Sequence, residues 1–437
     1  MQQQQQIKTA LVWFRNNLRV HDNISLKKAI DENQKVIAVY FFDPKYFDND
    51  EFGFQKTAKF RAKFLIETIV NLKQNLAALN ITLLTFFDAP KNNIKSLCNT
   101  FSIDTIYTQK EWTKEEIETN YLIKKSLDNK IDLIENYDQF LYPPETVSKN
   151  FNNIPDIFSV FRKKLEKYVA VLEEVYLSKL PKDNVVHNTT SIPNLQDFGF
   201  DDFDITNKTA FPFKGGETAA LERLNYYLFE SKKVSFYKKT RNGLVGNDYS
   251  TKFSPWLANG SISAKTIYWS IQKYEQEFGK NQSTYWVIFE LIWRDYFKYI
   301  SLKYGAKIFK IGGILDRNYQ WKSDRKTIQK WINGETKDDF VNANMIELKE
   351  TGWMSNRGRQ NVASYFAKEL LLDWRIGASY FESILLDYDV HSNYGNWMYV
   401  AGVGNDPRDR KFNTQLQAER YDRNHKFRNL WLEKTLF

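Results

Sequence analysis

The 437-residue sequence has little of what disulfide-rich and metal-binding proteins need, since it contains one cysteine and four histidines. A single cysteine excludes a disulfide scaffold and a cysteine-based zinc site, and is compatible with a reducing compartment. The histidines (His21, His187, His391 and His425) lie far apart and form no H-E-x-x-H spacing. No apolar run approaches the roughly 18 residues of a transmembrane helix, and no signal or transit peptide is evident. We therefore expect a cytoplasmic protein, with nucleoid association as an option, that binds neither metal nor membrane.

Three glycine-rich motifs are also missing. The sequence contains no G-x-G-x-x-G, no G-x-x-x-x-G-K-[ST] and no G-x-S-x-G. A Rossmann-type dinucleotide site, a P-loop and a nucleophile elbow of the hydrolase type therefore have no support.

Aromatic residues and positive charge are abundant and unevenly distributed. Phe, Tyr and Trp make up 16% of the chain, and the net charge is +9. Residues 1–200 carry two of the twelve tryptophans and a net charge of +1, whereas residues 201–437 carry ten and a net charge of +8. A basic half indicates a polyanionic partner such as nucleic acid, although surplus lysine on a solvated surface is the alternative.

Apolar periodicity divides the chain into three parts. Residues 1–135 alternate between helical patterns and five short apolar runs, at 10–14, 36–42, 81–86, 103–107 and 131–134. This alternation predicts an α/β domain with a doubly wound parallel sheet. Residues 136–214 hold six of the ten prolines and predict an extended interdomain linker. Residues 215–437 have helical periodicity almost throughout, which predicts an all-α domain.

Two segments of the helical part could carry chemistry. The loop Gly243–Ser254 offers hydroxyl groups and Lys252, which suit a phosphate or pyrophosphate; the alternative is a loop leading into a helix that starts at Ser254. In the second segment, Glu290 shares a helical face with Trp286 and Trp293. A carboxylate beside two indoles is costly unless it is paired or meets a ligand. The alternative is an ordinary i,i+4 ion pair between Glu290 and Arg294, worth about 0.3–0.5 kcal/mol.

Two further clusters lie near the C-terminus. Asn356, Arg357 and Arg359 fall within four residues, and arginine is well suited to bind phosphates and carboxylates. The stretch 387–389 supplies two aspartates and is followed by Asn393 and Trp397. Two acids and an amide near a basic motif could bind the edge of a polar ring, or could simply cap and pair.

Together these segments resemble the photolyase/cryptochrome family, and most closely its DASH cryptochrome branch. The segment V-W-F-R-N-N-L-R-V-H-D-N at 12–23 is similar to the family's N-terminal motif, with Asn17 in place of the usual Asp. Four later segments, D-Y-S-T-K-F-S-P-W-L-A, E-L-I-W-R-D-Y-F, T-G-W-M-S-N-R-G-R-Q-N-V-A-S and N-W-M-Y-V-A-G-V-G-N-D-P-R, follow in the order of that branch. The resemblance implies a photolyase-like architecture, with an antenna-binding domain over 1–135 and an FAD-binding catalytic domain over 215–437.

The resemblance implies the following site residues. The cofactor FAD, active as the reduced anion, would be held by a set of eleven: Tyr237, Ser250, Thr251, Lys252, Phe253, Ser254, Arg294, Arg359, Asp387, Asp389 and Asn393, with Arg359 paired to Asp387. The electron relay would be Trp397, Trp374 and Trp321. The lesion cavity would use Glu290, Trp293 and Asn356, and DNA would contact Arg241, Arg357, Gln360 and Tyr399.

Departures from the family pattern refine the expected substrate. Asn356 and Gln360 stand where six-four photolyases need histidines, so that lesion is not expected. Tyr399 stands where duplex-repairing photolyases usually carry a second tryptophan, as in the DASH branch, which the resemblance links to single-stranded DNA. The segment at 336–348 departs more strongly, since Lys337, Asp339, Asn342 and Ile346 replace the family's Gly, Pro, Asp and Arg.

The sequence thus predicts a monomeric deoxyribodipyrimidine photo-lyase that repairs cyclobutane pyrimidine dimers, preferably in single-stranded DNA, by electron transfer from photoexcited reduced FAD. The resemblance also implies a methenyltetrahydrofolate antenna between the domains, near Glu111. Two alternatives remain: a blue-light photoreceptor or nucleic-acid-binding regulator without significant repair, and a helical nucleic-acid-binding protein without a flavin.

Overall fold

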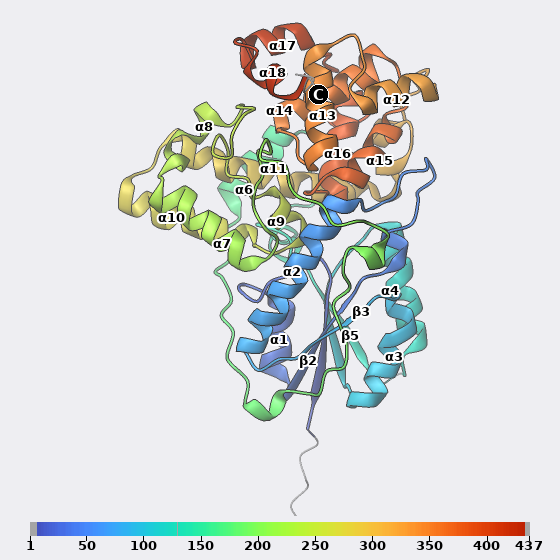
Figure 1. The fold of residues 1–437 in the computed structure, drawn as a ribbon. Helices are drawn as coiled ribbons and strands as arrows, with labels where there is room; N and C mark the ends of the chain where they lie inside the picture. The colour runs from blue at the N-terminus through green and yellow to red at the C-terminus, as the bar shows by residue number, and fades with distance from the viewer. Residues whose placement is uncertain (1–6, 129, 433–437) are drawn as a thin grey trace, which may run out of the picture.

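The computed structural model describes residues 7–128 and 130–432. In Figure 1 a sheet-containing part, coloured blue and cyan, lies below a larger helical part coloured from yellow to red. An extended green segment runs along the sheet-containing part between them.

The lower part is built on a five-stranded parallel sheet in the order β3-β2-β1-β4-β5. All six residues of the central strand β1 are buried, because helices cover both faces of the sheet. Helices α1 and α2 pack on one face and α3 and α4 on the other (Figure 1). The doubly wound parallel sheet is thus confirmed. The element bounds are β1 (Thr9–Phe14), α1 (Ile24–Glu32), β2 (Lys35–Phe41), α2 (Lys59–Ala78), β3 (Leu83–Phe86), α3 (Pro90–Phe101), β4 (Thr105–Gln109), α4 (Lys114–Ser126) and β5 (Asp132–Asn136).

The segment after the sheet contains two helices, α5 (Pro144–Val147) and α6 (Phe158–Tyr168), and then little but short 3-10 turns up to residue 216. Backbone and side-chain hydrogen bonds attach its extended portion to the sheet. The amide of Asn184 accepts from Val36 N at 2.8 Å and donates to Val36 O at 2.9 Å. Farther along, Thr190 Oγ1 accepts from Thr85 N at 2.9 Å. These hydrogen bonds therefore fix the extended portion of the segment along the sheet.

The upper part is helical, as predicted, and its core is rich in aromatic side chains. Trp256, Trp331 and Trp374 are among its largest fully buried side chains. No helix in the described part of the chain is long and apolar enough to cross a membrane. The helices are α7 (Glu217–Asn225), α8 (Tyr237–Thr240), α9 (Ser254–Asn259), α10 (Ala264–Phe278), α11 (Gln282–Tyr304), α12 (Arg325–Asn333), α13 (Asp339–Thr351), α14 (Asn356–Ser364), α15 (Trp374–Ile384), α16 (Val390–Ala401), α17 (Thr414–Tyr421) and α18 (Lys426–Leu432), with single π-helical turns at Tyr226–Glu230 and Tyr365–Glu369.

The unusual segment at 336–348 forms a well-capped helix. The side chain of Asp338 accepts from Val341 N and caps α13. The Asn342 amide accepts from Thr336 N at 2.8 Å and donates to Thr336 O at 3.0 Å, which closes the preceding turn. The departures from the family pattern therefore leave an ordered helix with a complete hydrogen-bond cap.

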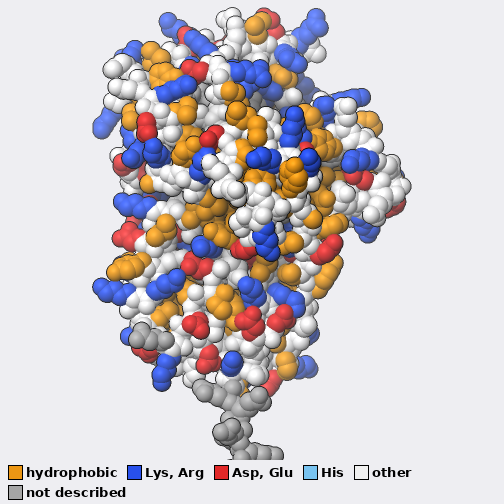
Figure 2. Space-filling view, turned by 180° about the vertical axis from the view of Figure 1, so that it is seen from behind, with side chains coloured by type: hydrophobic (Ala, Val, Ile, Leu, Met, Phe, Trp, Pro, Cys, Tyr) orange, Lys and Arg blue, Asp and Glu red, His pale blue; other side chains and the backbone are white. Residues whose placement is uncertain are grey.

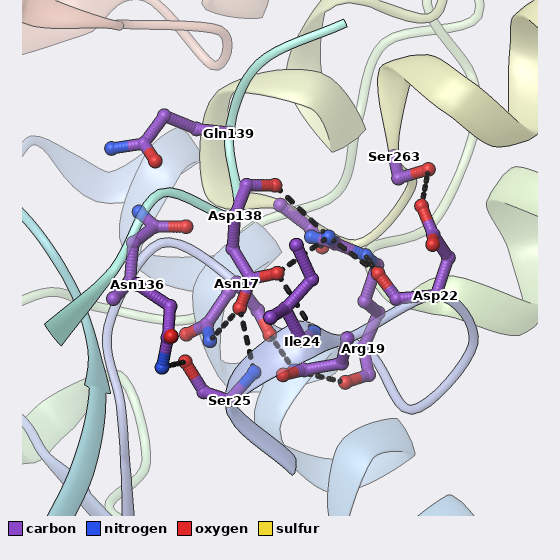
Figure 3. Close-up of polar contacts among 12 residues, drawn as sticks. Asn17, Arg19, Asp22, Ile24, Ser25, Asn136, Asp138, Gln139 and Ser263 are labelled. Atoms are coloured by element: carbon purple, nitrogen blue, oxygen red, sulfur yellow. Dashed lines mark hydrogen bonds and ion pairs between the residues drawn. The ribbon is translucent and has the colours of Figure 1, made fainter. Parts of the chain in front are cut away.

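A buried ionic network joins the two parts of the protein (Figure 3). Asp22 is fully buried and pairs with Lys265 Nζ at 2.6 Å across the domain junction, and it also accepts from Ser263 Oγ at 2.6 Å. Arg19 donates to Gly260 O at 3.0 Å and to Asp138 O at 3.1 Å. The loop after β1, the end of β5 and the start of α10 are thereby fixed to one another.

Removing one partner of this network should be strongly destabilising. Lys265→Met leaves Asp22 as an uncompensated buried charge, which costs about 3–5 kcal/mol. Lys27→Met is the matched control, because Lys27 forms an exposed i,i+4 pair with Asp31 at 2.7 Å, worth about 0.3–0.5 kcal/mol. Urea unfolding measures both free energies of unfolding. Equal effects of the two substitutions would contradict the assignment of Lys265 to the junction.

Candidate functional site

Helices α14, α15 and α16 enclose a cavity in the helical part. Seven of the predicted site residues line it together, six of them predicted for the flavin, the lesion or the relay and Gln360 for DNA: Asn356, Arg359, Gln360, Asp387, Asp389, Asn393 and Trp397. They come from two stretches of the sequence, 356–360 and 387–397, which the packing of the helices brings to one place. The other predicted residues do not line this cavity, and Arg294 lines a second, larger cleft.

The floor of the cavity carries the predicted ion pair. Arg359 donates to Asp387 Oδ2 at 2.9 Å and to Met354 O at 2.9 Å, so the pairing of these two residues is confirmed. Asp387 Oδ1 is buried and has no hydrogen-bond partner among the described residues. Buried polar atoms are almost always paired in folded proteins. This oxygen is therefore available to accept a hydrogen bond from a bound group.

Asp389 is held by a lysine that the sequence analysis did not identify. Lys298 on α11 pairs with Asp389 Oδ2 at 2.6 Å, and Asp389 Oδ1 caps α16 by accepting from Ser392 N. Burial alone would raise the pKa of Asp389, but the Lys298 ammonium and neighbouring positive charge hold that pKa well below its usual value. Asp389 is therefore ionised. Nearby, Asn393 donates to Ala378 O at 2.9 Å, which fixes its amide in the wall of the cavity.

The predicted phosphate-binding loop, 250–254, is shaped by a second residue that the sequence did not reveal. Arg223 on α7 is buried, donates to the carbonyls of Ser250 and Thr251, and pairs with Asp248 at 2.7 Å. Because these partners lie about 25 residues away in the sequence, no local pattern pointed to Arg223. Phe253 is buried, and Ser254, at the start of α9, is exposed.

Lys252 is the unusual residue of this loop. It is buried and has a left-handed φ of 65°. Its ammonium lies 3.4 Å from the ring centroid of Tyr249 and 4.5 Å from that of Trp353, and it has no hydrogen-bond partner among the described residues. Burial holds the pKa of Lys252 well below its usual value. An anionic group that pairs with this ammonium would restore its charged form.

Trp353 connects the loop to the cavity. Its ring contacts Lys252 on one side and the Arg359 guanidinium, 5.7 Å from the centroid, on the other. A ligand reaching from Asp387 to Lys252 would therefore run past Trp353. An acceptor for a ring N–H and a cation for a pyrophosphate are the groups that FAD needs, so these residues fit that cofactor.

A second functional cluster surrounds Glu290. Its carboxylate pairs with Arg241 at 2.7 Å. The ordinary pair with Arg294 is therefore wrong: Arg294 instead donates to Leu257 O at 2.9 Å and to Gln139 O, since the side chain is drawn toward the domain junction. Burial raises the pKa of Glu290, and Arg241 lowers it. Arg241, expected to contact DNA, is thus committed to Glu290 in this structure.

Aromatic rings line the approach to Glu290. Trp293 stacks on Phe158 with a centroid separation of 3.6 Å and meets Tyr399 edge-on at 6.0 Å. Trp286 lies on the same helix, and its indole N–H lies close enough to Glu290 to lower the pKa of that carboxyl. Tyr237 is buried next to Arg241, and burial raises its pKa to about 12.

Two of the predicted DNA-contacting residues, Arg357 and Gln360, contact each other. Arg357 donates to Gln360 Oε1 at 2.9 Å and to Asn242 Oδ1 at 3.1 Å, so its guanidinium is held in place. Figure 2 shows Lys and Arg side chains distributed around exposed hydrophobic side chains on the face opposite to the view of Figure 1.

The three predicted relay tryptophans are linked through one helix and one backbone contact. Trp397 packs so tightly against α15 that a Cβ on Gly377 would lie 2.3 Å from its Cη2. Trp374 begins that same helix and donates to Ile311 O at 2.9 Å. Lys322 N donates to Leu371 O at 2.8 Å, which ties the loop of Trp321 to the segment before Trp374. Trp397 and Trp374 are buried, and Trp321 is partly exposed.

A larger cleft of about 780 Å³ lies between the two parts of the protein. Glu111 lines it and accepts from Gln109 Nε2 at 2.7 Å, while burial raises the pKa of the carboxyl. Aromatic side chains such as Tyr46 and Phe309 form much of the wall. Asp389 lines both this cleft and the smaller cavity. The cleft can therefore hold a planar ligand close to the flavin site.

Comparison with family profiles assigns both parts of the chain. Residues 10–182 match the family described as DNA photolyase, and residues 286–435 match the FAD binding domain of DNA photolyase. The profile for the FAD binding domain covers most of the residues around the smaller cavity, and it supports FAD as the cofactor.

Relatives and solved structures agree with this assignment. The chain is 42% identical to cryptochrome DASH of Synechocystis, over 97% of this chain and 87% of the relative, and 43% identical to cryptochrome DASH of Xenopus laevis, over 96% and 81%. The crystal structure of a Synechocystis cryptochrome matches with a TM-score of 0.93 at 41% identity, over 97% of this chain and 88% of that one. An archaeal photolyase from Sulfolobus tokodaii, solved with two FAD molecules, matches with a TM-score of 0.78 at 27% identity, over 97% and 90%. The chain belongs to the photolyase/cryptochrome family, within its DASH cryptochrome branch.

Proposed function

We propose that the protein is a light-driven, monomeric repair enzyme that splits cyclobutane pyrimidine dimers, preferably in single-stranded DNA. The observation that carries this proposal is the Glu290 carboxyl, which is partly buried on the helix that also carries Trp286 and Trp293 and is paired with Arg241. Because burial raises the pKa of this carboxyl and Arg241 lowers it, a ligand that displaces Arg241 would change its protonation state. A helical nucleic-acid-binding protein without a flavin would have no need for such a carboxyl.

FAD, when bound and reduced, supplies the electron that is lent to the dimer and recovered after the ring has opened. Asp387 Oδ1 would help to hold the flavin, because it can accept a hydrogen bond from a ring N–H. Asn393 is a neutral amide and cannot deliver a proton as an acid would, which supports an anionic reduced form. Lys252, which has no hydrogen-bond partner among the described residues, would meet the pyrophosphate.

Glu290 and Arg241 can act together on the substrate. A DNA phosphate near Arg241 would draw the guanidinium from Glu290 and remove the interaction that lowers the pKa of the carboxyl. Burial would then favour the protonated form, which can donate a hydrogen bond to the negative charge that develops on a dimer carbonyl. The same arginine thus serves both in binding DNA and in controlling the acid.

The single-strand preference is supported by the residues flanking the lesion cavity. Tyr399 meets Trp293 edge-on, and its hydroxyl accepts from Arg410 at 2.7 Å, so the clamp opposite Trp293 is a phenol rather than an indole. Gln360 is tied to Arg357. Flipping a dimer out of a duplex costs a few kcal/mol, so a smaller aromatic surface reduces duplex repair most.

We also propose that the cleft between the two parts holds a methenyltetrahydrofolate antenna, with Glu111 as a binding residue. A buried carboxyl suits the amino group and ring N–H of a pterin, and the aromatic wall suits its planar ring. Because Asp389 lines both the cleft and the cavity, such a chromophore would lie close to the flavin.

Asp387→Asn should weaken FAD binding. A hydrogen bond to a charged group contributes about 1.5–3 kcal/mol, which corresponds to about a 10- to 100-fold rise in the Kd for FAD. Quenching of FAD fluorescence by the flavin-free protein measures the Kd. Asp316→Asn is the control, since Asp316 lies on the surface with a side chain that is 61% exposed. An unchanged Kd for Asp387→Asn would remove Asp387 from the flavin site.

Blue light should remove pyrimidine dimers from a UV-treated single-stranded oligonucleotide in the presence of the reduced, FAD-loaded protein. Glu290→Ala should lower the yield of repair about tenfold, because one hydrogen bond to the dimer is lost, and exposed Glu350→Ala should not. The recovery of pyrimidine absorbance measures repair. A duplex that contains the same UV-treated strand should be repaired more slowly than the single strand. Absence of light-dependent repair in the loaded wild type would favour the alternative, a blue-light photoreceptor or nucleic-acid-binding regulator.

Glu111→Ala should abolish folate binding and leave FAD in place. Purified protein reconstituted with methenyltetrahydrofolate should show a folate absorption band beside the flavin bands, and the variant should lack the folate band alone. Glu118→Ala, an exposed position on α4, serves as the control. Folate retained by Glu111→Ala would place the antenna elsewhere.

A further inference from the structure

A tyrosine lies at the outer end of the tryptophan series. The ring of Tyr319 is 5.3 Å from that of Trp321, centroid to centroid, and Trp321 N donates to Tyr319 O at 3.0 Å, so a tight turn holds the two side chains together. Both rings are partly exposed. At this separation the two aromatic systems are in van der Waals contact, and an electron can pass between them directly.

The phenol of Tyr319 has a proton acceptor. Its hydroxyl donates to Asp409 Oδ2 at 3.0 Å. Asp409 also pairs with Lys368 and lies 3.9 Å from Arg317. Burial would raise the pKa of Asp409, but its hydrogen bonds from Lys368 and Tyr319 lower it below its usual value. The acceptor is therefore an ionised carboxylate, hydrogen-bonded to the phenol in the direction in which the proton would leave.

This pairing has a chemical consequence. A phenol that loses an electron becomes a strong acid, so tyrosine oxidation at neutral pH proceeds readily only where a base takes the proton. Tryptophan can carry the positive charge on its ring without losing a proton. A tyrosine with a hydrogen-bonded carboxylate at the end of a tryptophan series can thus trap a hole that would otherwise return.

We infer that Tyr319 is the terminal electron donor of the relay, with Asp409 as its proton acceptor. The inference rests on the proposed relay through Trp397, Trp374 and Trp321, in which photoexcited oxidised flavin is the oxidant. In the terminal step the Trp321 radical cation takes one electron from Tyr319, and the phenolic proton passes to Asp409 Oδ2. The products are neutral Trp321, a neutral Tyr319 radical and a protonated Asp409, so charge and electrons balance.

Tyr394 is the nearest competitor and lacks the acceptor. Its ring lies 6.1 Å from that of Trp374, but its hydroxyl forms no hydrogen bond to a carboxylate in the described part of the chain. Burial raises the pKa of Tyr394 well above its usual value. Loss of its proton is therefore opposed, whereas Tyr319 has a carboxylate in place.

Electron paramagnetic resonance during illumination of the oxidised, FAD-loaded protein tests this inference. The wild type should give a neutral tyrosyl signal that changes when the protein carries ring-deuterated tyrosine. Tyr319→Phe should replace it with a shorter-lived tryptophan radical, and Asp409→Asn should lower the tyrosyl yield at least tenfold. Tyr394→Phe is the matched control and should keep the tyrosyl signal.

Two results overturn the inference, and Trp397→Phe distinguishes them. If Trp397→Phe slows flavin photoreduction but the tyrosyl signal is absent from the wild type or persists in Tyr319→Phe, the relay stands and the role of Tyr319 is wrong. If Trp397→Phe leaves photoreduction unchanged, the relay is wrong and Tyr319 loses its role with it. Repair by the reduced protein is measured separately and depends on neither result.

Discussion

The buried charges at the domain junction set the geometry on which both proposed cofactor sites depend. Asp22 lies in the sheet-containing part and Lys265 in the helical part, and neither can be hydrated once the two parts have docked. Each charge is tolerable only with its partner in place, so the docking has one favourable arrangement. The cleft beside Glu111 takes its shape from that arrangement, and Asp389 connects it to the smaller cavity within the helical part.

The contacts of Asn17 show that the identity of a single residue matters at this junction. Its amide donates to Asp138 Oδ2 at 3.3 Å, and Asp138 in turn accepts from the backbone at Ile24 and Ser25 (Figure 3). An aspartate at position 17, the residue usual in the family, would place a second carboxylate beside Asp138. The amide removes that repulsion and adds a donor, so this departure from the family pattern suits its surroundings.

The three acidic side chains of the candidate site are all paired with basic side chains. Each acidic side chain there is held by a cation from another part of the chain: Asp387 by Arg359, Asp389 by Lys298 and Glu290 by Arg241. Tertiary packing supplies the partner in every case. This arrangement fixes the carboxylates in place before any ligand binds, and it leaves Asp387 Oδ1 and the Lys252 ammonium without partners. A preorganised site of this kind spends little free energy on rearrangement.

The sequence by itself determined the local structure and the residue types at the site. Short apolar runs and helical spacings predicted the parallel sheet and the helical domain, and ordered motifs indicated Arg359 paired with Asp387. Sequence spacing indicated the wrong partner for Glu290, because the i,i+4 rule considers only residues of one helix. In the structure Arg294 donates to a backbone carbonyl at the domain junction, and Glu290 pairs with Arg241. Arg223 and Lys298 gave no signal, since their partners lie 25 residues or more away. Only the tertiary structure decides which distant charges meet, because pairing energies in a buried site depend on distances that sequence spacing does not encode.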